Sequence, residues 1–294
     1  MKIVIATAEP HANYHLSYFD SEHAKGLIHL VPSVNDVQGE SLVPVTDKLD
    51  VLDNAKLLVI TGGVVTEWTH MIGYMANERD IPVVFSELAY TQEVPEHPHV
   101  PDFKAVSAVS PYGAFNLHGY AEHIDHIDIT GHPMLDDLPE WNPESKRLLV
   151  LSSEFKSDAG LSLKTSIRSL EAEGWNVIVR LHPRESRDSW DGFNISKTRS
   201  LIEDLVISEA VIGIPGTAFA TAAAMHIPTA AVEGSTLDTV LPEYKYLFPY
   251  IKPSDVAKDI KHVAALSPAA TEFITGPVGG SADRLIAFWK SNEA

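Results

Sequence analysis

The sequence contains no cysteine, which excludes disulfide bonds, thiolate metal sites and a cysteine nucleophile. Basic residues are also few: 22 Lys and Arg stand against 40 Asp and Glu, for a formal net charge of −18. This balance is unfavourable for a nucleic-acid partner, although arginines gather locally between residues 180 and 187. No apolar run approaches the roughly 20 residues of a membrane span, and the first one, Lys2 to Ala6, is too short for a signal peptide. We therefore expect a soluble protein without a transmembrane segment, and the missing disulfides fit the cytoplasm.

Four common active-site signatures are absent: GxGxxG, the Walker A lysine motif, GxSxG and HExxH. Their absence argues against dehydrogenase, kinase, serine hydrolase and zinc peptidase chemistry. The chain does have 14 histidines, and Asp125-His126-x-Asp128 places three possible ligands close together. That stretch alternates polar with apolar residues, however, and a strand at a sheet edge explains it without a metal. We expect no metal and no resident cofactor.

Strand patterns followed by a turn and a helix pattern recur along the chain. The 294 residues exceed one domain of ~150 residues, and 45% of them are apolar. A Gly- and Pro-containing stretch between residues 131 and 145 separates two halves of similar pattern. The sequence predicts an α/β protein with two doubly wound Rossmann-like domains, 1-138 and 139-294, that face each other across a cleft.

The stretch from Glu209 to Gly234 carries the clearest single unit of this pattern. An apolar run from Ala210 to Ile214 breaks at a Pro-Gly turn, an alanine-rich helix pattern follows, and a second apolar run ends at Glu233. Gly216 in the turn allows close approach of a ligand to the backbone, and Thr217 is expected to cap the helix. The free N–H groups of such a helix end attract anions. An ordinary strand-helix-strand unit with a threonine cap is the alternative interpretation.

Two further strands of the second half end in polar residues. Ser152 and Ser153 follow one predicted strand, and Arg180, His182 and Arg184 lie at the end of another. Because the carboxyl ends of parallel strands share one edge of a sheet, these groups and the Gly216-Thr217 turn are expected to converge on one phosphate or diphosphate site. Alternatively, Pro183 merely ends the strand and His182 is a half-buried hydrogen-bonding residue.

The first half offers candidates for proton transfer and for binding an acceptor. The segment after the first strand, Thr7 to His29, is rich in histidine and aromatic residues, and loops at this position form the ligand crevice of open α/β sheets. Glu9, His11 and His15 are candidate bases, and His11 is preferred because it follows the strand closely. A solvated loop is the alternative for each. Gly62 and Gly63 either contact the acceptor or simply form a tight turn, and the turn is favoured.

Three of these stretches carry a resemblance to known families. Thr130-Gly131-His132-Pro133-x-x-Asp136 resembles the TG(N/H)PxxD signature of the GT-B fold, which glycosyltransferases share with non-hydrolysing UDP-N-acetylglucosamine 2-epimerases. The stretch from Arg180 to Arg184 is similar to the HP motif of bacterial sialyltransferases and the LHPR motif of CDP-glycerol glycerophosphotransferases. Gly216-Thr217 corresponds to the Ser/Thr positions that receive the donor phosphate in these families. The acidic DDGS-type motif of the sialyltransferases is absent.

The resemblance implies a metal-independent glycosyltransferase that uses a nucleotide-activated sugar or polyol. The donor phosphates would lie on the Gly216-Thr217 helix end beside His182 and Arg184, and Glu233 would bind ribose or sugar hydroxyls. A base of the first domain would deprotonate a glycan or another hydroxyl acceptor. An epimerase or a CDP-polyol phosphotransferase on the same fold is an alternative, and so is a non-enzymatic module that binds a nucleotide sugar.

Overall fold

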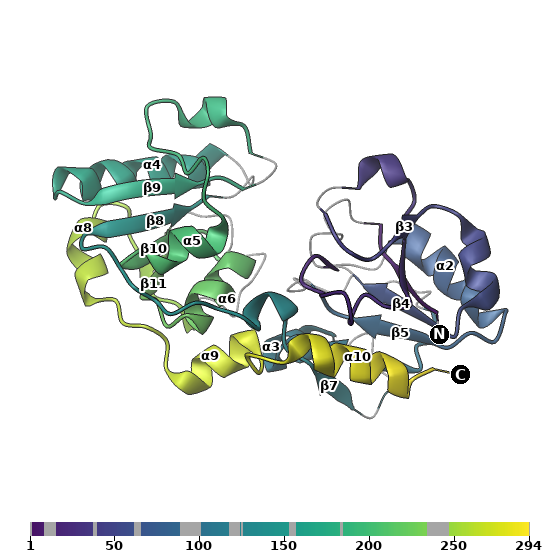
Figure 1. Cartoon of the computed structure of the whole chain (residues 1–294). Coiled ribbons are helices and arrows are strands. Elements are labelled where there is room, and N and C mark those ends of the chain that lie inside the picture. Colours follow the sequence, from purple (N-terminus) through teal and green to yellow (C-terminus); the bar gives the residue numbers. More distant parts are fainter. Residues whose placement is uncertain are drawn as a thin grey trace. The chain divides into compact units, whose positions relative to one another are not determined.

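The computed structural model describes residues 2–8, 16–37, 40–61, 66–88, 101–117, 124, 126–152, 157–182, 185–233 and 247–293 (Figure 1). The chain divides into two compact units. Unit 1 combines Met1–Asp137 with Glu272–Ala294, and unit 2 is Leu138–Thr271. The predicted domains, 1-138 and 139-294, did not anticipate that the last segment of the chain packs with the first.

Unit 1 is built on a seven-stranded parallel sheet of order β3-β2-β1-β4-β5-β6-β7. Its strands are β1 Ile3–Ala6, β2 Leu27–Leu30, β3 Val45–Thr46, β4 Leu57–Thr61, β5 Val83–Ser86, β6 Ala105–Ala108 and β7 Ile127–Ile129. Its helices are η1 Val34–Asp36, η2 Leu49–Asn54, α2 Glu67–Asn77, α3 Pro111–Asn116, η4 Pro133–Leu135 and α10 Ser281–Ser291. The chain leaves β1 in one direction and returns to β4 on the other side, so the sheet is doubly wound.

The two faces of the unit 1 sheet are covered by helices that lie far apart in the sequence, α2 and α10. Val4, Leu58 and Ile60 face α2, whose Ile72 and Ala76 are fully buried. Their neighbours in the strands point the other way and pack against Leu285, Phe288 and Trp289 of α10. Since successive side chains of a strand alternate between faces, a continuous apolar run such as Leu57–Ile60 serves both layers.

Unit 2 contains a five-stranded parallel sheet of order β12-β11-β10-β8-β9. The strands are β8 Arg147–Leu151, β9 Asn176–Arg180, β10 Ala210–Gly213, β11 Thr229–Val232 and β12 Tyr250–Ile251. The helices are α4 Ser157–Ala172, η5 Arg187–Trp190, α5 Leu201–Val206, α6 Thr217–Ala224, α8 Val256–Asp259, η7 Ile260–His262 and α9 Pro268–Thr275, the last of which runs into unit 1. The two parallel sheets with their helices confirm the predicted α/β class.

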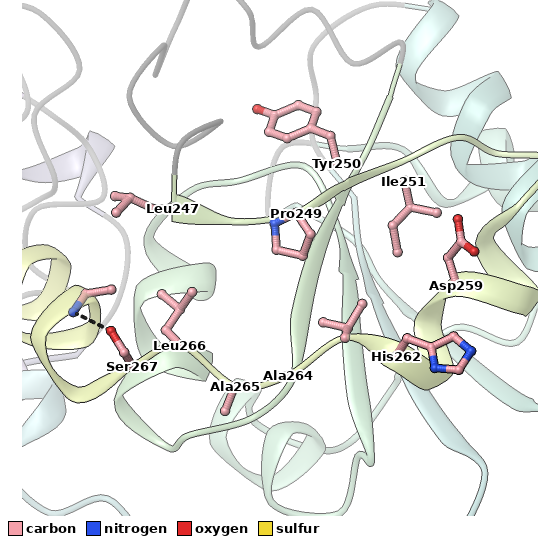
Figure 2. Close-up of a pocket in the computed structure, with 12 residues that line it drawn as sticks. Leu247, Pro249, Tyr250, Ile251, Asp259, His262, Ala264, Ala265, Leu266 and Ser267 are labelled. Carbon is pink, nitrogen blue, oxygen red and sulfur yellow. Dashed lines mark hydrogen bonds between the residues drawn. The ribbon is translucent and has the colours of Figure 1, made fainter.

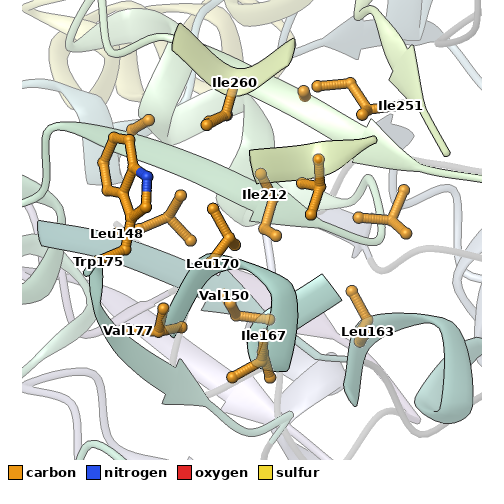
Figure 3. Packing of buried hydrophobic residues seen from close by; sticks show 14 of the residues in the cluster. Leu148, Val150, Leu163, Ile167, Leu170, Trp175, Val177, Ile212, Ile251 and Ile260 are labelled. Atoms are coloured by element: carbon orange, nitrogen blue, oxygen red, sulfur yellow. The ribbon is translucent and has the colours of Figure 1, made fainter. Parts of the chain in front are cut away.

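The core of unit 2 joins the sheet to α4 (Figure 3). Leu163, Ile167 and Leu170 lie three or four residues apart, which puts them on one face of α4, and all are buried. They pack against Leu148 and Val150 of β8, an interior strand of the sheet. This packing fixes the strands whose carboxyl ends carry the predicted phosphate site.

Several elements differ from the sequence-based expectation. The histidine-rich segment from Thr7 was expected to be a loop as far as His29, but His29 lies inside β2 and is fully buried. The sequence pattern from Ser254 to Leu266 predicts one helix, but helical turns end at His262 and α9 begins at Pro268. The strands β2, β3 and β12 were not predicted, because β3 and β12 have only two residues each and β2 contains a histidine.

The TGHPxxD stretch holds the start of α10 in place within unit 1. Both carboxylate oxygens of Asp136 accept backbone N–H groups of α10, from Ser281 at 2.8 Å and Ala282 at 3.0 Å. Arg284 donates back to the carbonyl oxygen of Thr130 at 2.7 Å. Gly131 has φ +78, and a Cβ there would lie 2.4 Å from the Pro277 carbonyl oxygen, so the turn requires glycine. The motif therefore fastens the returning C-terminal helix to unit 1.

Candidate functional site

The carboxyl ends of four neighbouring strands of unit 2 carry the predicted donor site. In the order β11, β10, β8 and β9, the residues at or after these ends are Glu233, Gly216 with Thr217, Ser152, and Arg180 with His182. Neighbouring strands of a sheet lie roughly 4.8 Å apart, so these groups line one edge. The chain reverses its winding between β8 and β10. This is the point at which doubly wound sheets bind their ligands.

The turn from β10 into α6 is shaped by two glycines. Gly213 has φ +152, and a Cβ there would lie 2.2 Å from the carbonyl oxygen of Leu151. Gly216 is the N-cap residue of α6, and Thr217 is the first residue of the helix. The expectation that Thr217 caps the helix is therefore wrong, since a residue in the first helical turn cannot take the cap position.

Open space lies beside Gly216. A Cβ built on this residue would meet no atom of the described residues within 4 Å, and no side chain in that part of the chain caps α6. The first N–H groups of a helix have no partner inside the helix, and they carry partial positive charge from the helix dipole. An uncapped helix start with free space beside it can accept an anionic group.

Ser152 and His182 are held together by a compact set of hydrogen bonds. The backbone N–H of His182 donates to the Ser152 hydroxyl oxygen at 3.2 Å. The Ser152 hydroxyl contacts a carboxylate oxygen of Glu185 and the Arg180 carbonyl oxygen. The other Glu185 oxygen accepts the Trp190 indole N–H at 2.7 Å. Ser152 therefore orders the end of β9 within the fold, whatever it contributes to a ligand.

The Arg180 side chain makes contacts within unit 2. Its Nη1 lies 3.1 Å from Oδ2 of Asp204 and 2.9 Å from the Arg199 carbonyl oxygen. The Asp204 carboxylate is almost fully buried and also accepts the Ser196 hydroxyl at 2.6 Å. This Arg180 nitrogen is thus engaged by the protein, and the ion pair ties β9 to α5.

A cavity of about 580 Å³ opens elsewhere in unit 2, beside the edge strand β12 (Figure 2). Apolar side chains such as Leu247, Ile251 and Leu266 form much of its wall, together with Asp259 and His262. Its lining contains none of the strand-end residues of the predicted donor site. β12 links it to them, because the carbonyl oxygen of Ile251 accepts the backbone N–H of Glu233 at 2.9 Å.

In unit 1, the winding reverses between β1 and β4; Thr7 follows β1, and Thr61 is the last residue of β4. The candidate bases Glu9, His11 and His15 follow β1, and Gly62 and Gly63 follow β4; all five lie outside the described residues. Ser153 and Arg184 of the predicted phosphate site lie outside them as well. The assignments of these residues stay predictions.

Two ionisable side chains of unit 1 are completely buried near the same sheet edge. Glu87 follows β5 and accepts the Val109 N–H at 2.9 Å. His132 lies 2.9 Å from the Leu88 carbonyl oxygen through Nε2, and its Nδ1 accepts the Met134 N–H at 3.0 Å. Burial lowers the pKa of His132 to about 4, and these partners fit the neutral ring with its proton on Nε2.

The sequence analysis named neither Glu185 nor Asp204 as site residues, although both hold strand-end residues in place. Glu185 lies within the charged stretch after β9, and only the fold shows that its partners are Ser152 and Trp190. Among the described residues, no three His, Asp or Glu side chains come together as metal ligands. His126 and Asp128 are exposed at the edge strand β7.

The sequence matches no protein-family model and no curated protein sequence. Solved structures of similar fold were found, and the alignments with three of them each cover 99% of this chain. A variant of the wall teichoic acid polymerase TagF aligns with a TM-score of 0.65 at 12% identity over 88% of its chain. Acinetobacter baumannii MurG aligns at 0.64 and 10% identity, over 99% of its chain. The UDP-GlcNAc 2-epimerase of Methanocaldococcus jannaschii aligns at 0.57 and 11% identity, over 99% of its chain.

No helix among the described residues is long and apolar enough to cross a membrane. The chain has the GT-B fold, as the resemblance of its motifs implied.

Proposed function

We propose that this protein is an enzyme that binds a nucleotide-activated sugar or polyol in unit 2 and transfers the activated group to an acceptor hydroxyl. The observation that carries the proposal is the alignment of Glu233, Gly216 with Thr217, Ser152 and His182 along one sheet edge, at the β8–β10 reversal. The GT-B fold supports it, because a UDP-sugar epimerase is among the proteins of similar structure.

The donor diphosphate would bind at the N-terminal end of α6. There the open space beside Gly216 leaves room for phosphate oxygens, and the first N–H groups of the helix and the Thr217 hydroxyl supply donors. His182 and Arg184 would contact the remaining oxygens. These groups would stabilise the negative charge that develops on the departing nucleotide, so the transfer would need no metal ion. Glu233, one strand further along, would bind hydroxyls of the ribose or the sugar.

Unit 1 is assigned to the acceptor. A hydroxyl group attacks the donor sugar more readily when a base removes its proton. His11 is the preferred base, with Glu9 and His15 as further candidates, because all three follow β1 where the winding of the sheet reverses. Gly62 and Gly63 follow the neighbouring strand β4 and would contact the acceptor.

A nucleotide-sugar epimerase is the second candidate, favoured by the structural likeness to the Methanocaldococcus jannaschii enzyme. It would use the same diphosphate site but would need no separate acceptor. A CDP-polyol phosphotransferase and a non-enzymatic nucleotide-sugar module also share the site. The module differs from the enzymes because it would bind without turnover.

Turnover of UDP-GlcNAc and of other nucleotide sugars and CDP-polyols tests the proposal. With a hydroxyl acceptor present, a transferase releases the nucleotide, whereas an epimerase changes the sugar without an acceptor. We expect His182→Ala to abolish turnover while the folded state persists, and a chelator to leave turnover unchanged. Saturable nucleotide binding without turnover, unaffected by replacement of Glu9, His11 and His15, would instead establish a binding module.

A further inference from the structure

We propose that Glu185 is a positioning residue. Through the Ser152 hydroxyl, it holds the backbone of His182 at the end of β9 and thereby sets the affinity of this site for a nucleoside diphosphate. The ligand in this inference rests on the proposed function, whereas the geometry stands independently of it.

The contacts form a chain that begins in the core of unit 2. The Trp190 side chain is buried in the hydrophobic cluster around α4 and packs edge-on against Phe193, with ring centroids 5.7 Å apart. Its indole N–H donates to Oε1 of Glu185 at 2.7 Å. Packing of the large ring in a dense interior fixes one oxygen of the carboxylate.

The second oxygen of the carboxylate continues the chain to the site. Oε2 of Glu185 contacts the Ser152 hydroxyl, whose oxygen accepts the His182 N–H at 3.2 Å. The Glu185 N–H in turn donates to the carbonyl oxygen of His182 at 2.9 Å. Both backbone polar groups of His182 are thus tied to Glu185, one directly and one through Ser152.

The negative charge of Glu185 allows its positioning of His182 to be distinguished from its electrostatic effect on ligand binding. A carboxylate close to a diphosphate site repels the ligand, so its negative charge alone weakens binding. Both of its oxygens, however, accept hydrogen bonds from the protein. Removal of the carboxylate therefore changes electrostatics and positioning in opposite directions, and binding measurements separate the two.

Two substitutions of Glu185 distinguish geometry from charge. In Glu185→Gln, the amide oxygen can accept the Trp190 N–H, and the amide nitrogen can donate to the Ser152 oxygen. Ser152 can then donate its own proton to the Arg180 carbonyl oxygen, 3.1 Å away, and still accept the His182 N–H. Glu185→Ala loses both side-chain contacts of residue 185, those with Trp190 and Ser152, and keeps only its backbone bond to the His182 carbonyl oxygen. Asp191→Ala is the matched control, because it removes a carboxylate from the same loop at an exposed position without a hydrogen-bonding role in the described structure.

Calorimetric titration of the full chain with UDP is the first measurement. We expect Glu185→Ala to weaken binding about tenfold, or about 1.4 kcal/mol, against the direction expected from the lost charge. Glu185→Gln and Asp191→Ala should stay within about twofold of wild type. In a Ser152→Ala background, Glu185→Ala should have little further effect, because the two residues act through one path. Tighter UDP binding by Glu185→Ala would overturn the proposal. So would additive losses of affinity from Ser152→Ala and Glu185→Ala in the double variant.

Hydrogen exchange of the His182 backbone amide, followed by NMR without ligand, separates this inference from the proposed function. We expect exchange about fivefold faster in Glu185→Ala and near the wild-type rate in Glu185→Gln, since loss of one hydrogen-bonded contact corresponds to about 1 kcal/mol. If UDP does not bind wild type, the proposed ligand is wrong, and the exchange rates still decide whether Glu185 positions His182. Equal exchange in wild type and Glu185→Ala would refute the positioning role.

Discussion

Replacement of Asp136 by alanine should loosen the C-terminal helix of unit 1. Gly280, the N-cap residue of α10, provides no side-chain cap, and the Asp136 carboxylate accepts the N–H groups of Ser281 and Ala282 instead. Loss of a capping side chain costs about 1–2 kcal/mol, and loss of a negative charge at a helix start costs a further 0.3–1 kcal/mol, roughly. The sum, about 2 kcal/mol, corresponds to about 30-fold in an equilibrium constant.

Hydrogen exchange of α10 amides is the suitable assay, because two units can unfold separately and a single global free energy of unfolding is then not defined. We expect exchange in α10 to become about 30-fold faster in Asp136→Ala. In Asp136→Asn, the exchange rate should lie between those of wild type and Asp136→Ala, since the amide keeps one acceptor oxygen. The neighbouring Asp137 is exposed, and Asp137→Ala should exchange at nearly the wild-type rate. If exchange in α10 is less than twofold faster in Asp136→Ala, or equally faster in Asp137→Ala, the Asp136 carboxylate does not hold the start of α10.

Two further predictions concern stability. Burial lowers the pKa of His29 and of His132 to about 4, from 6.5. Each neutral imidazole therefore contributes about 3 kcal/mol to the free energy of unfolding above pH 6.5, and this contribution is lost as the pH falls towards 4. NMR titration of the two imidazoles checks this, and titration of both between pH 6 and 7 would contradict it. Arg180→Ala should destabilise unit 2 by about 2–3 kcal/mol, below the range for a fully buried pair because Arg180 is 28% exposed. Urea unfolding measures this loss, and an unchanged midpoint would show that the Asp204 carboxylate does not depend on Arg180.

Much of the fold could be predicted because local pattern and tertiary structure agree. Leu57 to Ile60 is a continuous apolar run followed by Gly-Gly and a helix pattern, and the structure has β4 and α2 there. The run predicts a strand buried on both faces, as parallel sheets require. The same argument applies to Arg147 to Leu151, which form the interior strand β8 of unit 2.

The elements that could not be predicted depend on contacts distant in sequence. The return of α10 to unit 1 rests on Asp136 and Arg284, which lie far apart in the chain. The strand β2 contains a buried histidine, His29, which gives a four-residue run a polar appearance. Neither feature has a local signal, because burial by distant segments overrides local propensity.

The candidate site, like the fold, could be predicted only in part from the sequence. Strand ends with polar residues could be identified from the sequence, since the parallel sheet brings them to one edge. The sequence could not predict which of these side chains face a ligand, because the contacts of Ser152 with Glu185 and of Arg180 with Asp204 form only in the folded protein. The cap position of Gly216, in place of Thr217, depends on backbone angles that the residue types do not determine.

The variant Gly216→Val tests the proposed diphosphate site at the N-terminal end of α6, with UDP binding as the readout. The backbone at Gly216 is extended, with φ −178, and no atom of the described residues would meet a new Cβ within 4 Å, so the variant should fold. Its side chain would occupy the space assigned to the phosphates. The account predicts that UDP raises the melting temperature of wild type but not of folded Gly216→Val. Equal stabilisation of both proteins by UDP would contradict it.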